Sequence, residues 1–169
     1  EPPTRDECPI CMLLLPNVSM VRYQSCCGKM ICSGCIVASK IAGDNRCLCP
    51  FCRIPASTSG GEHVERIKER AAAGDAVAIH ELGGLYYRGD YGLRQNDSKA
   101  MKLLLRAGEL GYTLAYGRIG FSYENGEGVE RDERKAKYYY ELAAMGGSIA
   151  ARHNLGVLEK RAGKFDRAM

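Results

Sequence analysis

The chain has 169 residues, enough for one ordinary domain or two small ones, and carries a net charge of +4 at pH 7. The charge is evenly spread, with 6 Lys/Arg against 4 Asp/Glu in residues 1–56 and 18 against 16 in the rest. This balance argues against nucleic acid or a membrane surface as the partner. No run of about 18 apolar residues occurs, so we expect no membrane span. Since the chain begins at Glu1, we expect an excerpt of a longer protein.

All nine cysteines lie in the first 52 residues, and six of them form three Cys-x-x-Cys pairs. A secreted chain held by disulfides favours an even count. Thiols paired at this spacing are more typical of zinc ligands in a reducing compartment. We therefore expect zinc in preference to disulfides, and a cytoplasmic or nuclear location.

The ligand candidates follow one another as CPIC (8–11), the adjacent Cys26 and Cys27, CSGC (32–35) and CPFC (49–52). A Cys-Pro-x-Cys turn exposes backbone N–H groups toward its sulfurs, which stabilises thiolates. Zinc takes four tetrahedral ligands, so eight sulfurs would hold two ions and leave no open position for catalysis.

This pattern resembles the RING finger family, in an all-cysteine variant. The resemblance implies a small α+β cross-brace domain over residues 1–56 in which the ligand pairs interleave. Its first zinc site would comprise Cys8, Cys11, Cys32 and Cys35, and its second Cys26, Cys27, Cys49 and Cys52. Cys27 would then replace the family's usual histidine. Alternatively, either Cys26 or Cys27 is free, and Cys47 or a water completes the second site; otherwise Cys47 is a spare thiol.

The same resemblance implies ubiquitin ligase activity, in which the domain docks a charged ubiquitin-conjugating enzyme and forms no covalent intermediate. Ile10 would insert into that partner, and Pro50 would lie beside a groove with Ile36 and Leu48. Arg53 directly follows the last ligand, and its guanidinium could bond ubiquitin and the conjugating enzyme together, orienting them. The plain alternative is a solvated arginine in a surface loop.

Residues 1–56 hold too few apolar side chains to fold well without metal. Within them, residues 36–43 (IVASKIAG) are expected to form a short helix between the third and fourth ligand pairs. Residues 57–61 have the composition of a linker, and residues 62–75 are expected to form a leading helix that shields the repeats described next.

The second half of the chain repeats itself. AIHELGGLYYRG (78–89), AYGRIGFSYENG (115–126) and ARHNLGVLEKRAG (151–163) share one frame, at offsets of 37 and 36 residues. A second frame links SKAMKLLLRAGELG (98–111) to RKAKYYYELAAMGG (134–147). Such a period with two helical segments predicts an all-α solenoid, in which Gly111 and Gly147 end the second helix of each unit.

These frames resemble Sel-1-like repeats, relatives of the tetratricopeptide repeat, at about 75–111, 112–147 and, incompletely, 148–169. The solenoid is expected to present a concave face to a protein substrate. His80 and His153 occupy equivalent positions and are interpreted as scaffold residues. Of the run Tyr138–Tyr140, at least part is expected to be core, because consecutive residues point to different faces of a helix.

The sequence thus predicts a zinc-stabilised RING domain followed by a helical-repeat solenoid. The expected function is a RING-type ubiquitin ligase with a ubiquitin-conjugating enzyme and a protein substrate as partners. The alternative is a non-enzymatic zinc-binding adaptor that only mediates protein contacts. The sequence leaves the oligomeric state open.

Overall fold

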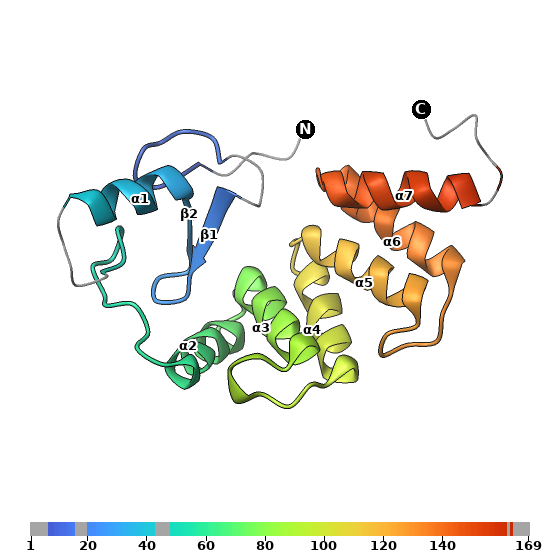
Figure 1. Cartoon of the computed structure of the whole chain (residues 1–169), viewed down its shortest axis with the longest axis horizontal. Coiled ribbons are helices and arrows are strands. Elements are labelled where there is room, and N and C mark those ends of the chain that lie inside the picture. Colours follow the sequence, from blue (N-terminus) through green and yellow to red (C-terminus); the bar gives the residue numbers. More distant parts are fainter. Residues whose placement is uncertain (1–6, 16–19, 43–47, 162, 164–169) are drawn as a thin grey trace. The chain divides into compact units, whose positions relative to one another are not determined.

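A computed structural model describes residues 7–15, 20–42, 48–161 and 163 (Figure 1). Its contacts divide the chain into two compact units, Glu1–Ala78 and Ile79–Met169. The expectations for Cys47 and for the end of the third repeat fall outside the described residues. Among the residues that are described, none of the helices is both long enough and apolar enough to span a bilayer.

A small hairpin and one helix form the centre of the first unit. Strands β1 (Val21–Gln24) and β2 (Lys29–Cys32) pair antiparallel, and helix α1 (Ser33–Ile41) follows directly (Figure 1). The helix begins three residues earlier than the predicted start at residue 36, because Cys32 caps it: its Sγ accepts the N–H of Cys35 at 3.5 Å. A cysteine can therefore serve as a helix cap as well as a candidate ligand.

The core cluster beside the hairpin consists largely of sulfur. Its buried members are Cys8, Ile31 and Cys49, and other cysteines pack around them. Several apolar side chains remain exposed instead, namely Leu13, Leu14, Val37 and Ile41. So few buried carbon atoms contribute little hydrophobic stabilisation, which is typical of a fold that depends on metal.

Helix α2 (Gly60–Ala72) completes the first unit. Its buried residues are Val64, Ile67 and Ala71. On another face, Arg70 donates from Nε to the Ser25 carbonyl and from Nη2 to the Cys26 carbonyl, both at 3.1 Å. These charge-assisted bonds tie α2 to the turn between β1 and β2.

The second unit is built from helix pairs, as the repeat predicts. Its helices are α3 (Ala76–Arg88, of which the first three residues belong to the first unit), α4 (Asp97–Glu109), α5 (Leu114–Asn125), α6 (Glu133–Met145) and α7 (Ile149–Arg161), with a short 3₁₀ turn, η2 (Asp90–Gly92), after α3 (Figure 1). Helices α4 to α7 each pack on the next along the chain. The predicted all-helical repeat is confirmed.

The second helices of the repeats end as predicted. Gly111 and Gly147 have φ angles of +93° and +90°, which a residue with a side chain rarely adopts. At the first of them the chain reverses through a bond from the Tyr112 N–H to the Ala107 carbonyl at 3.0 Å. Glycine is therefore needed at these two positions for its backbone conformation.

Helix α2 has the register of another second helix of a repeat. Its N-cap Ser59 lies 37 residues before the α4 cap Asn96, which lies 36 before the α6 cap Asp132, and each cap accepts the N–H three residues on. Gly74, with φ +85°, ends α2 as Gly111 ends α4. Thus α2 has the sequence pattern of a repeat helix, but its contacts assign it to the first unit.

The three consecutive tyrosines of α6 take three different environments. Tyr140 is fully buried and donates to Glu124 Oε2 at 2.8 Å. Tyr139 stacks on Tyr116 and Tyr123, with ring centroids 5.9 and 5.6 Å away, whereas Tyr138 is exposed. The expectation that part of this run is core is confirmed.

Candidate metal centres

Eight cysteines gather into two groups of four within the first unit. One group comprises Cys8, Cys11, Cys32 and Cys35, and the other comprises Cys26, Cys27, Cys49 and Cys52. Within each group all sulfur atoms lie within 4.8 Å of one another. The groups interleave along the chain, and they are the two sets that the RING resemblance implied. Each could hold one metal ion.

The distances between sulfur atoms match those of a tetrahedral metal site and exclude disulfides. Cys11 and Cys32 are 3.8 Å apart at Sγ, Cys27 and Cys49 are 3.9 Å apart, and Cys26 and Cys52 are 3.4 Å apart. A disulfide would need about 2.05 Å. Sulfurs placed tetrahedrally about 2.3 Å from a central ion are about 3.8 Å from one another. The thiols, all unbonded to one another, therefore fit a tetrahedral metal site.

The two Cys-Pro-x-Cys segments form the same turn. In the first, the Cys8 N–H donates to the Leu13 carbonyl and the Met12 N–H to the Cys8 carbonyl, both at 2.9 Å. The second repeats these bonds among Cys49, Arg53 and Ile54, at 2.9 and 3.0 Å. The residue after each pair is left-handed, with φ +58° at Met12 and +63° at Arg53. Each turn therefore brings two thiols, and backbone N–H groups beside them, to one candidate metal position.

Those backbone N–H groups change the acidity of the first thiol in each turn. Burial raises the pKa of Cys8, but N–H donors from Cys11, Cys32 and Ile10 outweigh it and bring the pKa to about 6. In the second turn burial is likewise outweighed by N–H donors, and the pKa of Cys49 is lowered. Both turns thus stabilise a thiolate, the form that binds metal.

Three other thiols, those of Cys26, Cys27 and Cys35, have raised pKa values. A hydrogen bond to Cys32 raises the pKa of Cys35 to about 12, and burial with a hydrogen bond to Cys52 raises that of Cys26. Four sulfurs this close resist ionising together without a countercharge. A bound dication supplies that countercharge, so metal binding would release protons.

The adjacent cysteines lie on the tight turn between β1 and β2. The N–H groups of Cys27 and Gly28 both donate to the Gln24 carbonyl, at 3.1 and 2.8 Å, and Gly28 has φ +71°. A Cβ at Gly28 would lie 2.5 Å from the Arg70 guanidinium, so glycine also allows the Arg70 side chain of α2 to lie against the turn. The turn brings the sulfurs of Cys26 and Cys27 into one group.

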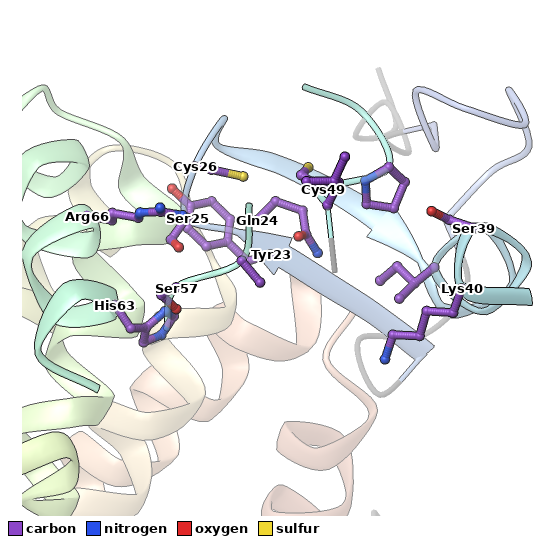
Figure 2. Close-up of a pocket in the computed structure, with 14 residues that line it drawn as sticks. Tyr23, Gln24, Ser25, Cys26, Ser39, Lys40, Cys49, Ser57, His63 and Arg66 are labelled. Carbon is purple, nitrogen blue, oxygen red and sulfur yellow. The ribbon is translucent and has the colours of Figure 1, made fainter. Parts of the chain in front are cut away.

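Three of the predicted partner-binding residues lie together. Ile36, Leu48 and Pro50 line a hollow of about 330 Å³ next to the second cysteine group (Figure 2). Ile10 and Arg53 are not part of its lining. Both are exposed, on the first and second Cys-Pro-x-Cys turns respectively, and Ile10 has 40% of its surface accessible.

The other wall of this hollow was missed by the sequence analysis. It is formed by α2, through His63 and Arg66 (Figure 2). The signal that could have found it is the repeat register of α2, because both residues occupy positions that are apolar in α4 and α6.

The family model described as Sel1 repeat matches residues 76–112 and 113–148. A curated relative, the ERAD-associated E3 ubiquitin-protein ligase component HRD3B of Arabidopsis thaliana, is 34% identical over 98 residues, which is 57% of this chain. The chain spans about 15% of the length of that relative.

Two solved structures share the helical fold, each over 59% of this chain. One is c5321, a protective antigen of uropathogenic Escherichia coli strains displaying an SLR fold (38% identity, TM-score 0.56, 21% of its length). The other is a Sel1 repeat protein from Oxalobacter formigenes (36% identity, TM-score 0.52, 74% of its length). Residues 76–148 of this chain are therefore Sel1 repeats.

Proposed function

We propose that this chain is a RING-type ubiquitin ligase whose two cysteine groups bind zinc. The observation that carries the proposal is the interleaved grouping of eight thiols, with exposed apolar residues on the adjoining turns and helix. In this proposal the zinc-binding unit docks a ubiquitin-conjugating enzyme, and the Sel1 repeats bind a protein substrate.

Zinc is the metal that suits four thiolates in a tetrahedron. All four positions of each centre are filled by sulfur, so the ions would be structural. Zinc would neutralise the thiolates and fix the two Cys-Pro-x-Cys turns and the Cys26–Cys27 turn around common points. Because thiolate ligands persist in a reducing compartment, the proposal places the protein in the cytoplasm or nucleus.

The residues of the chain act by holding and orienting their partner. Ile10, Ile36, Leu48 and Pro50 would contact the conjugating enzyme with their apolar surfaces. Arg53 would donate to ubiquitin and the enzyme together, so that the thioester is presented to an incoming lysine in one orientation. The rate gain then comes from removed conformational freedom, without an acid–base step or covalent bond to this chain.

The comparison with HRD3B supports a ubiquitin context for the repeats. That relative is described as a component of an E3 ligase, and its similarity to this chain extends over 98 residues. We propose that the repeats here play a comparable part by recruiting the protein that is to be modified.

Arg53 offers a sharp test, because its backbone is left-handed. Arg53→Gly removes the guanidinium and at the same time relieves a conformation that costs a side-chain residue about 1 kcal/mol. We expect the purified variant to keep its zinc and its thermal stability while self-ubiquitination falls at least about tenfold. The measurement is a self-ubiquitination time course together with native mass spectrometry for zinc.

Met12→Gly is the matched control, since Met12 occupies the equivalent position of the first turn with φ +58°. It should keep the activity of the parent chain. Ile10→Ala should reduce transfer by weakening the docking of the conjugating enzyme. Full activity of both Arg53→Gly and Ile10→Ala would contradict the proposed mechanism.

A non-enzymatic adaptor is the second candidate. It is favoured by the similarity to HRD3B, which is described as a ligase component, because a component can serve in recruitment alone. An adaptor would bind zinc and a protein partner but would support no transfer with any of a panel of conjugating enzymes.

A further inference from the structure

Helix α2 carries polar residues where the other repeat helices are apolar. The positions of His63, Arg66 and Arg70 are filled in α4 by Ala100, Leu103 and Ala107, and in α6 by Ala136, Tyr139 and Ala143. All four alanines are at most 2% exposed. Two of them lie next to the first helix of their own repeat: a Cβ at Gly83 would lie 3.3 Å from the Ala100 carbonyl oxygen, and one at Gly117 would lie 3.7 Å from Ala143 Cβ. Repeat packing therefore does not explain the polar residues of α2.

These three side chains are directed to the cysteine-rich part of their unit. Arg70 bonds the carbonyls of Ser25 and Cys26, whereas His63 and Arg66 line the hollow (Figure 2). Arg66 is held in place by bonds to the Pro55 carbonyl at 2.8 Å and Glu62 Oε1 at 2.6 Å, which use two of its five N–H donors.

A second bond fixes the end of α2. Tyr23, which also lines the hollow, donates its hydroxyl to Asp75 Oδ2 at 2.6 Å. Asp75 in turn caps α3 by accepting the N–H groups of Val77 and Ala78 at 3.1 Å. Together with the Arg70 bonds, this makes α2 a fixed wall of the hollow.

The lining of the hollow combines an apolar floor with basic side chains. Ile36, Leu48 and Pro50 supply the apolar surface. Lys40 on α1 lies across from His63 and Arg66 on α2 (Figure 2), and the described residues of the lining include no carboxylate. Glu62 neutralises part of the Arg66 charge, and Lys40 adds a further positive charge to the described residues of the lining. Such a surface complements a protein loop that pairs an apolar side chain with an Asp or Glu.

We infer that α2 is a repeat helix converted into the second wall of the docking surface, and that the hollow selects conjugating enzymes whose docking loop carries an acidic residue beside its apolar one. This inference rests on the proposed function. A conjugating enzyme is favoured as the occupant because the floor consists of three residues to which the proposed function assigns its docking, and because the basic side chains beside them complement an acidic loop. The docking surface therefore extends beyond residues 1–56, where all the cysteines lie, into α2.

The test uses the full chain with zinc bound and a conjugating enzyme that the parent chain binds, with affinity measured by calorimetry. One variant combines His63→Ala with Arg66→Leu, the residues that α4 carries at these positions and good helix formers. A second is Lys40→Glu, on the opposite wall. The matched control is Lys68→Gln, on α2 but outside the lining. Zinc content and melting temperature are measured for all.

The expected result is that both hollow variants bind about tenfold more weakly, while Lys68→Gln binds like the parent. For Lys40→Glu the loss should shrink at high salt, since charge is what has changed. Parent-like binding by the hollow variants, with Ile10→Ala still weakening it, would overturn the inference and leave the proposed function standing. If the double variant bound more weakly but Lys40→Glu bound like the parent, the preference for an acidic docking loop would be refuted. Absence of binding by the parent to any conjugating enzyme would remove both.

Discussion

Removing the metal from the full chain with a strong chelator is expected to unfold the β1–β2 hairpin and α1 while helices α4 to α7 remain folded. Structural zinc at four thiolates contributes on the order of 10 kcal/mol at neutral pH. Among the described residues, the buried apolar core around it contains little beyond Ile31, so hydrophobic burial there is too small to replace that contribution. The repeats bury their own apolar cluster and contain none of the candidate ligands.

Hydrogen exchange with and without chelator measures this outcome segment by segment. Amides of β1, β2 and α1 should lose their protection and regain it when Zn²⁺ is added back, whereas those of α5 and α6 should not change. Native mass spectrometry should count two ions per chain before chelation. Retained protection of the hairpin after complete metal loss would refute the metal-dependent fold.

Replacing Gly120 by alanine is expected to destabilise the repeats by about 1–3 kcal/mol. A Cβ at this position of α5 would lie 2.7 Å from the ring of Tyr140, which is fully buried and bonded to Glu124. The ring cannot withdraw without breaking that bond, so the two helices must separate. Urea unfolding followed by circular dichroism at helix wavelengths measures the change.

The chain provides a control at the same repeat position. Gly156, which lies 36 residues after Gly120 in α7, would have nothing within 4 Å of an added Cβ. Gly156→Ala should therefore stabilise the repeats by up to about 1 kcal/mol, because alanine is the better helix former. If both substitutions changed stability in the same direction, the close approach of α5 and α6 would not be the reason why position 120 requires glycine.

The helical repeats could be predicted in detail because their signals are local. The caps, the alanine frames and the closing glycines recur at 36 and 37 residues, and each acts within one or two turns of its own position. The interleaved grouping of the cysteines was accessible only through resemblance to a family, since spacing does not state which pairs meet. The structure brings the same eight residues into the same two groups. Their role as zinc ligands stays a prediction.

The place of α2 could not be predicted from local patterns. Its caps and period mark it as a repeat helix, and the sequence analysis expected it to shield the repeats. Arg70 Nε also bonds the Ser25 carbonyl of the cysteine-rich hairpin, 45 residues away, and the expected shielding of the repeats stays a prediction. Likewise Leu13 and Leu14 have the character of core residues but are exposed, because sulfur fills the small centre of that unit.

The sequence by itself determined the two kinds of architecture in this protein, a thiol-rich module and a helical solenoid, because ligand spacing and helix caps act over short distances. Only the tertiary structure decided which helix forms a wall beside Ile36, Leu48 and Pro50, and therefore where a partner of this protein would be bound. That decision depends on bonds such as those from Tyr23 to Asp75 and from Arg70 to Cys26. Each joins residues more than 40 positions apart, and a single bond at that distance produces no periodic pattern in the sequence from which it could be predicted.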